Sequence, residues 1–465
     1  MTTISITDHG AVGDGRTMDT AAIQSAIDAC AAQGGGTVLL PAGKTYLAGS
    51  FELKSNIEFR VERGAVLKSA TREEDFPLFA FTTGREAGKR LWIGGRHLEN
   101  VAITGGGVID GSCHAFSLEE GDYIHTKTLK WRPAMTCFEG CRNFTVRDVT
   151  LRNSANWTLH FSGCEDVVVD GVRIYNDLKF PNADGIDPDH CRNVRISNCH
   201  IEAGDDCICL KNTQPYAQYG PCENITVSNC TLISTSSAIK IGTESVDDFR
   251  NLLFTNCVIR GSNRGLSIQL RDKGSVENVI FSNMTVETRH FHEGWWGAGE
   301  AIYVTAVPRS VASRSGPAVS DDRSLDAGVG FIRNVVFSNI LCDSENGIFV
   351  MGVSPEHVRD LRFDNVRLHL RKTSKWPGDR YDLRPCEASL QPTGAEPVGE
   401  LSDWGSKSKR ETAAVFIVNA AGITFHHCSV ERAPECSGTK LLEVFNTEGL
   451  DPGGLQESPA ETQRR

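Results

Sequence analysis

The dominant pattern in this chain is an alternation of apolar and polar positions over five or six residues, and it recurs in nine stretches. Each stretch starts with Arg or Glu, continues with Asn or Asp, and ends in a further Asn or Asp with Cys or an aliphatic residue. The clearest copies lie at 142–146, 192–199, 223–230, 250–257 and 277–284, and others begin at Glu99, Glu165, Arg333 and Arg359. Period-2 alternation bounded by Gly, Asn and Asp predicts strands with one buried face.

The copies also recur at a regular spacing. Their second residues are Asn143, Asp166, Asn193, Asn224, Asn251 and Asn278, in steps of 23 to 31 residues. A period in this range indicates a solenoid. One coil cannot bury its own apolar face, so successive coils must stack in parallel, with equivalent positions about 4.8 Å apart. The sequence therefore predicts an all-β fold, a right-handed parallel β-helix. No Leu-rich consensus or pair of helical repeats supports the competing solenoids.

The ends of the chain and two interruptions complete the predicted organisation. Asp19-Thr20 precedes Ile23, Ala26, Ile27 and Cys30, which fall on one helical face, and Gly34-Gly35-Gly36 follows. This pattern predicts a helix that caps the first coil. We expect residues 1–448 to form a single β-helix domain with loop insertions at about 286–331 and 372–412. Residues 449–465 are polar and predict a disordered tail.

The chain contains sixteen cysteines. Cys199, Cys230 and Cys257 occupy one repeat position, which predicts an internal column beside a ladder of Asn198, Asn229 and Asn256. The chain opens Met1-Thr2-Thr3-Ile4-Ser5 without a basic and apolar leader. We therefore expect reduced thiols and a cytoplasmic location rather than a disulfide framework. No Cys-x-x-Cys pair occurs, so no metal site is expected.

The net charge and the hydropathy of the chain argue against nucleic acid and membranes as partners. The net charge of −11 disfavours nucleic acid and anionic membrane surfaces. No apolar run approaches 18 residues, so no membrane-spanning segment is expected. The sequence carries no prediction of an oligomer.

Candidate chemistry concentrates in three adjacent coils. Asn182–Asp187 lies on one, Gly204–Cys209 on the next and Ser236–Gly242 on the third. We expect an inward column of Ile186, Ile208, Ile239 and Leu266. The neighbouring outward columns are then Asp187, Cys209, Lys240 and Ser267, followed by Asp189, Lys211, Gly242 and Gln269. This register places Asp184 beside Asp206, with Asp187 and Asp205 on the same face.

Several carboxylates packed together repel, so a cluster of this kind usually binds a cation or retains a proton. Hydrolysis of a glycosidic bond needs both forms: a protonated carboxyl group for the leaving oxygen and a carboxylate that activates water. The cluster therefore favours a glycosidase.

The same residues carry a resemblance to a known family. Asn182-Ala183-Asp184 and Asp205-Asp206 resemble the Asn-Thr-Asp and Asp-Asp motifs of family 28 glycoside hydrolases, the polygalacturonase and rhamnogalacturonan hydrolase group. Residues 8–15 and 34–38 resemble the start of many pectin-lyase-like β-helices. The resemblance implies that Asp205 is the general acid and that Asp184 and Asp206 activate water in one inverting displacement. It implies no metal and no cofactor.

Two departures from the family narrow the expected activity. Polygalacturonases have Gly-His-Gly on the third coil, where this chain has Ser236-Ser237-Ala238, and Arg-Ile-Lys on the fourth, where it has Ser267-Ile268-Gln269. The absent basic residues normally pair with the substrate carboxylate, so ordinary endo-polygalacturonase activity is not expected. Nearby candidates for substrate binding are Asn182, Asp187, Lys211, Lys240, Glu244, Gln269, Arg271, Trp295 and Trp296. The two tryptophans could stack on sugar rings or anchor their loop.

The expected function is hydrolysis of pectic oligosaccharides or polysaccharide of cell walls, at a galacturonate or related linkage and with exo action. Two alternatives remain open. A polysaccharide lyase would use Lys211 or Lys240 as the base and calcium held by the acidic cluster. A catalytically inactive carbohydrate-binding β-helix would bind without turnover.

Overall fold

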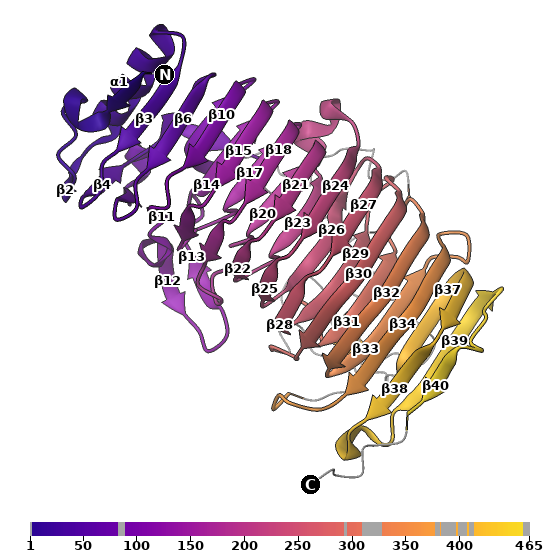
Figure 1. Ribbon diagram of the computed structural model, residues 1–465. Coiled ribbons are helices and arrows are strands. Elements are labelled where there is room, and N and C mark those ends of the chain that lie inside the picture. Colours follow the sequence, from indigo (N-terminus) through magenta and orange to yellow (C-terminus); the bar gives the residue numbers. More distant parts are fainter. Residues whose placement is uncertain are drawn as a thin grey trace. The chain divides into compact units, whose positions relative to one another are not determined.

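The computed structural model describes residues 2–81, 89–292, 295–308, 328–376, 382, 397–398, 407–408 and 413–458. The chain forms two compact units, Met1–Cys209 with Pro215–Cys230 and Leu210–Gln214 with Thr231–Arg465. Within each unit the stacked strands of successive coils run parallel to one another, as Figure 1 shows, so the predicted parallel β-helix is confirmed. The expectation of a single folding domain stays a prediction.

Within its described residues, the first unit contains one α-helix, which lies among short strands and 3₁₀ turns. Its elements are β1 (Thr3–Ser5), η1 (Ile6–His9), β2 (Asp14–Met18), α1 (Thr20–Ala32), β3 (Gly36–Leu40), β4 (Thr45–Ala48), β5 (Phe51–Glu52), β6 (Ile57–Val61), β7 (Val66–Ser69), η2 (Glu73–Asp75), β8 (Leu78–Ala80), β9 (Lys89–Arg96), β10 (Glu99–Thr104), β11 (Val108–Asp110), η3 (Cys113–Phe116), β12 (Ser117–Glu120), β13 (His125–Thr128), β14 (Ala134–Glu139), β15 (Arg142–Arg147), β16 (Thr150–Arg152), β17 (Leu159–Ser162), β18 (Glu165–Asp170), β19 (Arg173–Tyr175), β20 (Ile186–Asp189), β21 (Arg192–Ser197), β22 (His200–Ala203) and β24 (Cys222–Ser228).

Two elements, β23 (Ile208–Asn212) and η4 (Gln214–Tyr219), contain residues of both units. The strands of the second unit are on average longer. Its elements are β25 (Thr231–Ser234), β26 (Ser237–Ser245), β27 (Phe249–Thr255), β28 (Val258–Ser262), β29 (Arg264–Leu270), β30 (Val276–Thr288), β31 (Glu300–Ala306), β32 (Ile332–Ser344), β33 (Asn346–Gly352), β34 (Val358–Leu370), β35 (Pro397–Val398), β36 (Lys407–Ser408), β37 (Ala413–His426), β38 (Cys428–Arg432), η8 (Pro434–Cys436), β39 (Lys440–Glu448) and β40 (Leu455–Glu457).

The repeated stretches form stacked strands whose alternate side chains fill the interior. In the first unit Phe144, Val167, Val194 and Ile225 align in register through β15, β18, β21 and β24, and all are buried. The second unit carries a comparable aromatic column. The rings of Phe254, Phe281, Phe337, Phe363 and Phe425 follow one another at 4.7 to 5.1 Å, nearly parallel. This spacing matches the separation of hydrogen-bonded strands.

The Asn or Asp at the start of each repeat has a structural explanation. Asp166, Asn193 and Asn224 have φ angles of 59°, 57° and 59°, in the left-handed region that these residues tolerate better than others. Asn224 Nδ2 donates to Asn193 Oδ1 at 3.3 Å, and Asn193 Nδ2 donates to Asp166 Oδ1 at 3.3 Å. The repeat therefore conserves both a turn conformation and a side-chain ladder between coils.

The predicted N-terminal helix is present as α1, and its face of Ile23, Ala26, Ile27 and Cys30 is fully buried. Asp19 precedes it but makes no side-chain capping bond. Its carboxylate instead accepts from Val12 N at 2.6 Å and Gly13 N at 3.1 Å. Asp19 therefore secures the preceding loop rather than the first turn of the helix.

The structure has strands in two segments where the sequence predicts none. Strand β31 lies inside the interval 286–331 that the sequence assigned to a loop insertion. Strand β40 pairs with β38, aligning Leu455 with Cys428, inside the predicted disordered tail. β31 is mostly apolar and fully buried, so its side chains continue the core of the stack. β40 is polar, and coil stacking provides its backbone partners. Most of the predicted 372–412 insertion and residues 459–465 lie outside the described residues.

The cysteines of the described residues are free thiols, and nearly all are buried. Cys199 and Cys230 lie in the interior as predicted, and Asn229 Nδ2 donates to Asn198 Oδ1 at 3.3 Å beside them. Within the described ranges, no helix has both the length and the apolar character needed to span a bilayer.

Candidate active site

Three carboxyl groups meet in the first unit. Oxygen atoms of Asp184, Asp205 and Asp206 all lie within 4.8 Å of one another. The three residues are only 2%, 6% and 1% exposed. The crowding expected from the repeat register is therefore present, in surroundings with little access for screening water. Such an arrangement favours retention of a proton by one of the carboxyl groups or capture of a cation.

The cluster is assembled by direct pairing of two consecutive coils. Gly185 N donates to Asp206 O at 2.9 Å, and Ile186 N donates to Cys207 O at 2.9 Å. A Cβ atom on Gly185 would lie 2.4 Å from Cys207 O. Glycine at this position therefore allows the close approach of the two backbones that brings Asp184 to Asp206.

Asn182 links the first motif to the second. It has a left-handed conformation with a φ of 57°, and its backbone N–H donates to Asp205 Oδ2 at 3.3 Å. Asn176 Nδ2 donates to Ala183 O at 3.1 Å from the preceding turn. The Asn182-Ala183-Asp184 segment is thus held on both sides by side-chain contacts.

Arg132 supports this segment and was not singled out by the sequence. It is 5% exposed, and its guanidinium donates to Pro181 O at 2.7 Å, to Asn182 Oδ1 at 2.7 Å and to Ala155 O. Arg132 lies in Trp131-Arg132-Pro133, outside every repeat. Its contribution comes from long-range contacts that the repeat pattern does not contain.

Replacing Arg132 with Met is expected to lower the free energy of unfolding by about 2–3 kcal/mol, because buried acceptors lose a charged donor. The measurement is urea unfolding of the variant beside the wild-type protein. Arg142→Met is the matched control, since Arg142 is exposed and pairs with the partly exposed Glu165 at 2.7 Å. The control should change stability by at most about 1 kcal/mol. Equal effects of the two substitutions would contradict the supporting role of Arg132.

Asp187 lies next to a buried ion pair. Strand β20, which carries Asp187 and Asp189, pairs with β17 so that Asp187 aligns with His160. His160 Nε2 lies 3.1 Å from Asp189 Oδ2, and both side chains are fully buried. Burial lowers the pKa of His160, but the neighbouring Cys137 and Asp189 outweigh it and hold the pKa well above 6.5. The protonated imidazole of His160 therefore neutralises the buried carboxylate of Asp189, two residues after Asp187 on strand β20.

Because the folded pKa of His160 is raised, its contribution to stability is complete below pH 6.5 and is lost as the pH rises through the folded value. His160→Gln, which keeps a donor but removes the charge, should cost about 2 kcal/mol at pH 6 and less at pH 9. Denaturant unfolding at the two pH values measures this difference. His200→Gln, at a half-exposed pair with Glu202, is the control. A pH-independent cost at His160 would refute the assignment.

The second unit carries most of the residues predicted to bind substrate. Strands β26 and β29 align Ile239 with Leu266, Lys240 with Ser267 and Gly242 with Gln269, as the sequence register predicts. Lys211 and Gln269 are each 3% exposed, whereas Lys240 and Glu244 are half-buried. Their roles toward substrate stay predictions.

Arg271, proposed from the sequence to meet a substrate carboxylate, is 1% exposed. Its Nη1 donates to Leu270 O and to Thr305 Oγ1, each at 2.9 Å. These contacts place the guanidinium against the end of β29 and the neighbouring strand β31. Arg271 therefore stabilises the contact between β29 and β31 through these hydrogen bonds. Its predicted contact with a substrate carboxylate stays a prediction.

Trp295 and Trp296 are half-buried, with ring centroids 6.3 Å apart. Asn263 Nδ2 donates to Trp296 O, and Gly297 N donates to Asp382 Oδ2 at 2.7 Å. The backbone around this pair is therefore fixed by Asn263 and Asp382. Trp295 and Trp296 nevertheless stay partly exposed. Stacking on sugar and loop anchoring are compatible with this placement.

A buried charge network beside the tryptophan pair was also missed by the sequence reasoning. Arg264 Nε lies 3.2 Å from Glu300 Oε2, and Arg264 Nη2 lies 3.5 Å from Asp382 Oδ2. The guanidinium also lies over the Tyr303 ring, 3.8 Å from its centroid. All of these side chains are almost fully buried. The network connects β29 and β31 to residue 382, which is distant in the sequence.

Comparison with known proteins gives the family of the chain. The profile described as Glycosyl hydrolases family 28 matches residues 30–290. A probable polygalacturonase of Vitis vinifera is 33% identical over 258 residues, which are 52% of this chain and 51% of that protein. The chain thus spans about half the length of the curated relative.

Solved structures share the fold. A hyperthermoactive exopolygalacturonase of Thermotoga maritima matches with a TM-score of 0.62 and 25% identity, covering 80% of this chain and 88% of that one. A family 28 exopolygalacturonase of Yersinia enterocolitica matches with a TM-score of 0.72 and 19% identity, covering 96% of this chain and 78% of that one. Since the family profile covers more than half of the sequence, the chain belongs to glycosyl hydrolase family 28.

Proposed function

We propose that this chain is an O-glycosyl hydrolase that cuts pectic oligosaccharides or polysaccharide at a galacturonate-type or related linkage. The observation that carries the proposal is the buried cluster of Asp184, Asp205 and Asp206, whose carboxyl oxygens lie within 4.8 Å of one another. Family membership supports the same reaction class. Hydrolysis of a glycosidic bond needs one carboxyl group that gives a proton and another that takes one from water.

In the proposed mechanism Asp205 protonates the glycosidic oxygen, while Asp184 and Asp206 accept hydrogen bonds from the attacking water. The water gives its proton to one of these two carboxylates as its oxygen bonds to the anomeric carbon, and the bond to the leaving oxygen breaks in the same step. The Asn182 N–H contact to Asp205 Oδ2 supports a fixed orientation for the acid. Low exposure of the cluster strengthens its electrostatic interactions.

The spacing of the cluster bears on stereochemistry. Carboxyl groups of inverting glycosidases are commonly about 6.5–9.5 Å apart, which leaves room for water between them and the sugar. In this cluster one oxygen of each carboxyl group lies within 4.8 Å of the others. The proposed mechanism therefore places the water beside Asp184 and Asp206, to one side of the acid. We propose inversion on the family resemblance, and proton NMR of the first-formed anomer tests it. An initial product that retains the anomeric configuration would overturn this part of the proposal.

Exo action is the proposed mode. It is supported by the similarity to the Thermotoga maritima exopolygalacturonase, which is 25% identical over 80% of this chain. Ser237 and Gln269, where polygalacturonases of the resembled type carry His and Lys, support a substrate different from that of an ordinary endo-enzyme. An exo-enzyme should release only monomers or one short oligomer at early times.

The decisive experiment incubates the protein with oligogalacturonates and rhamnogalacturonan fragments in ¹⁸O-labelled water, with and without chelator, and follows products by mass spectrometry. A hydrolase adds one labelled water per cut and is indifferent to chelator. Unsaturated products that disappear with chelator would instead establish the lyase. Binding without any product would establish an inactive carbohydrate-binding protein, and either result would overturn the proposal.

A further inference from the structure

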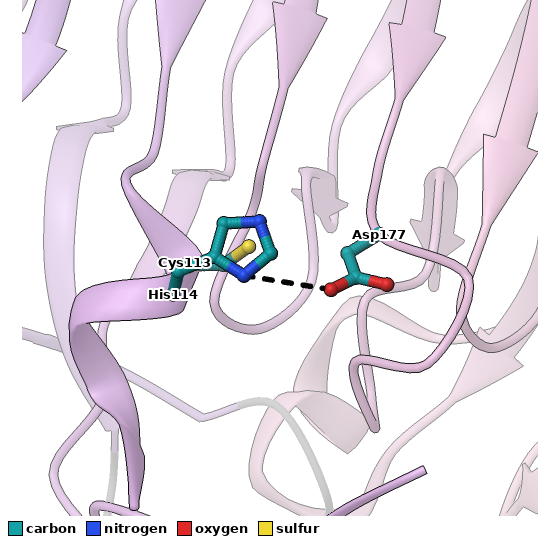
Figure 2. A group of neighbouring side chains, drawn as sticks. All are labelled: Cys113, His114 and Asp177. Atoms are coloured by element: carbon teal, nitrogen blue, oxygen red, sulfur yellow. Dashed lines mark ion pairs between the residues drawn. The ribbon is translucent and has the colours of Figure 1, made fainter. Parts of the chain in front are cut away.

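A second cluster of metal-ligating side chains lies in the first unit, apart from the three carboxyl groups. Figure 2 shows Cys113, His114 and Asp177 converging at one corner of the coils. One ligand atom from each lies within 4.8 Å of the others, and His114 Nδ1 is 3.6 Å from Asp177 Oδ2. Cys113 is fully buried, whereas the His114 side chain is 65% exposed. The cluster therefore combines a buried sulfur with a solvent-facing imidazole.

The β-helix register explains why these residues meet. Strands β11, β16 and β19 stack so that Asp110, Arg152 and Tyr175 align. Cys113 and His114 follow β11, and Asp177 follows β19, two coils further on. Cys113 N donates to Asn153 O at 2.9 Å, and Asn153 N donates to Tyr175 O at 3.1 Å. The three residues thus occupy the same corner of the solenoid.

The carboxylate of Asp177 is oriented before any ligand binds. Its Oδ1 accepts from Lys179 N at 2.9 Å, and its Oδ2 lies 2.9 Å from Nε2 of the buried His125. His125 Nδ1 is in turn 2.7 Å from Ser117 Oγ. Partners of this kind typically fix the geometry of metal ligands in proteins.

The donor set fits a zinc-type cation. Thiolate, imidazole and carboxylate are the ligands that zinc prefers in tetrahedral sites. Nitrogen and oxygen ligands at about 2.0–2.1 Å from a tetrahedral zinc lie about 3.4 Å apart, close to the separation of His114 Nδ1 and Asp177 Oδ2. We propose that Cys113, His114 and Asp177 form a binding site for a divalent cation of the zinc type, with solvent as the fourth ligand.

The thiol is protonated until a cation arrives. Burial and the charges of Asp177 and Asp110 raise the pKa of Cys113 to about 12. A bound cation would replace this proton, and the thiolate would then be neutralised by the metal. The absence of a Cys-x-x-Cys pair predicts no metal site, but the proposed site is built from turns two coils apart rather than from a local motif.

The cation would join the coil of Cys113 to the turn that leads into Asn182. A Cβ atom on Gly204 would lie 2.5 Å from Asp177 O, so the Asp177 backbone already abuts the residue before Asp205. The proposed site therefore has a stabilising role next to the candidate active site. It does not depend on the proposed glycosidase activity.

The test uses metal-free full-length protein titrated with Co²⁺ and observed by absorption spectroscopy. We expect one equivalent to bind with a thiolate-to-cobalt charge-transfer band and the visible bands of tetrahedral Co²⁺, and Zn²⁺ to displace it. Cys113→Ser should abolish the charge-transfer band. His114→Ala should weaken binding at least about tenfold, and this substitution at an exposed side chain leaves the buried core untouched.

Two controls separate this site from others in the chain. Cys141→Ser removes a different buried thiol, and Asp205→Asn alters the acidic cluster; both should bind Co²⁺ like the wild-type protein. Failure to bind Co²⁺, unchanged binding in His114→Ala, or a spectrum without the thiolate band would overturn the proposal. Loss of binding in Asp205→Asn alone would also overturn it, by assigning the cation to the three carboxyl groups.

Discussion

Asp205→Asn is expected to lower kcat on a cleavable pectic oligosaccharide by about 10²- to 10⁴-fold, the range typical of losing a general acid. The amide keeps the shape of the carboxyl group but cannot protonate the leaving oxygen. Asp184→Asn and Asp206→Asn should also reduce kcat strongly, because each removes a carboxylate from the proposed water site. Initial rates at saturating substrate measure all three variants.

A matched control makes the same chemical change elsewhere. Asp166 is exposed, lies in the side-chain ladder of the first unit and occupies a position that is Asn in most other repeats. Asp166→Asn should keep wild-type activity and the same unfolding transition. Full activity in Asp205→Asn, with the fold retained, would remove Asp205 from the catalytic role.

Arg264→Met should destabilise the protein by about 3–5 kcal/mol, because it leaves two buried carboxylates without their cation. Glu300 and Asp382 have no exposed side-chain surface, and Arg264 contacts both. Urea unfolding of the variant and the wild-type protein measures the loss. We also expect the anchor of the tryptophan pair to loosen, because Gly297 N donates to Asp382 Oδ2.

The control for this substitution is Arg333→Met. Arg333 is half-exposed and pairs with Glu277 at 2.6 Å, so its loss should cost at most about 1 kcal/mol. Adding Glu300→Gln and Asp382→Asn to Arg264→Met should recover part of the stability, since the buried charges are then removed together. No recovery would indicate that packing of the Arg264 side chain, rather than its charge, provides the stabilisation.

Local patterning was sufficient for the β-helix and for part of the site. Alternation identified the strands, and the recurring Asn and Asp identified the turns, because each coil repeats one backbone conformation. The register of Ile239 with Leu266 followed from the same periodicity. The proximity of Asp184 and Asp206 could also be predicted, since equivalent positions on adjacent coils must lie one strand separation apart.

Other features depended on contacts outside the repeat. β40 forms in a polar segment because β38 offers it backbone partners, and neither its existence nor its position follows from its own side chains. Asp19 precedes α1 as a capping residue would, yet its carboxylate binds the backbone of Val12 and Gly13 instead. In both cases the tertiary partner outweighs the local preference.

The sequence by itself determined the solenoid, its coil register and the meeting of the acidic motifs, because a fixed period relates positions on adjacent coils. Only the tertiary structure decided that Arg132 supports Asn182, that Arg264 pairs with Glu300 and Asp382, and that Cys113 and His114 face Asp177. The physical reason is that alternation specifies which face of a strand a side chain occupies. The partner across that face is chosen by turns and loops whose lengths follow no period.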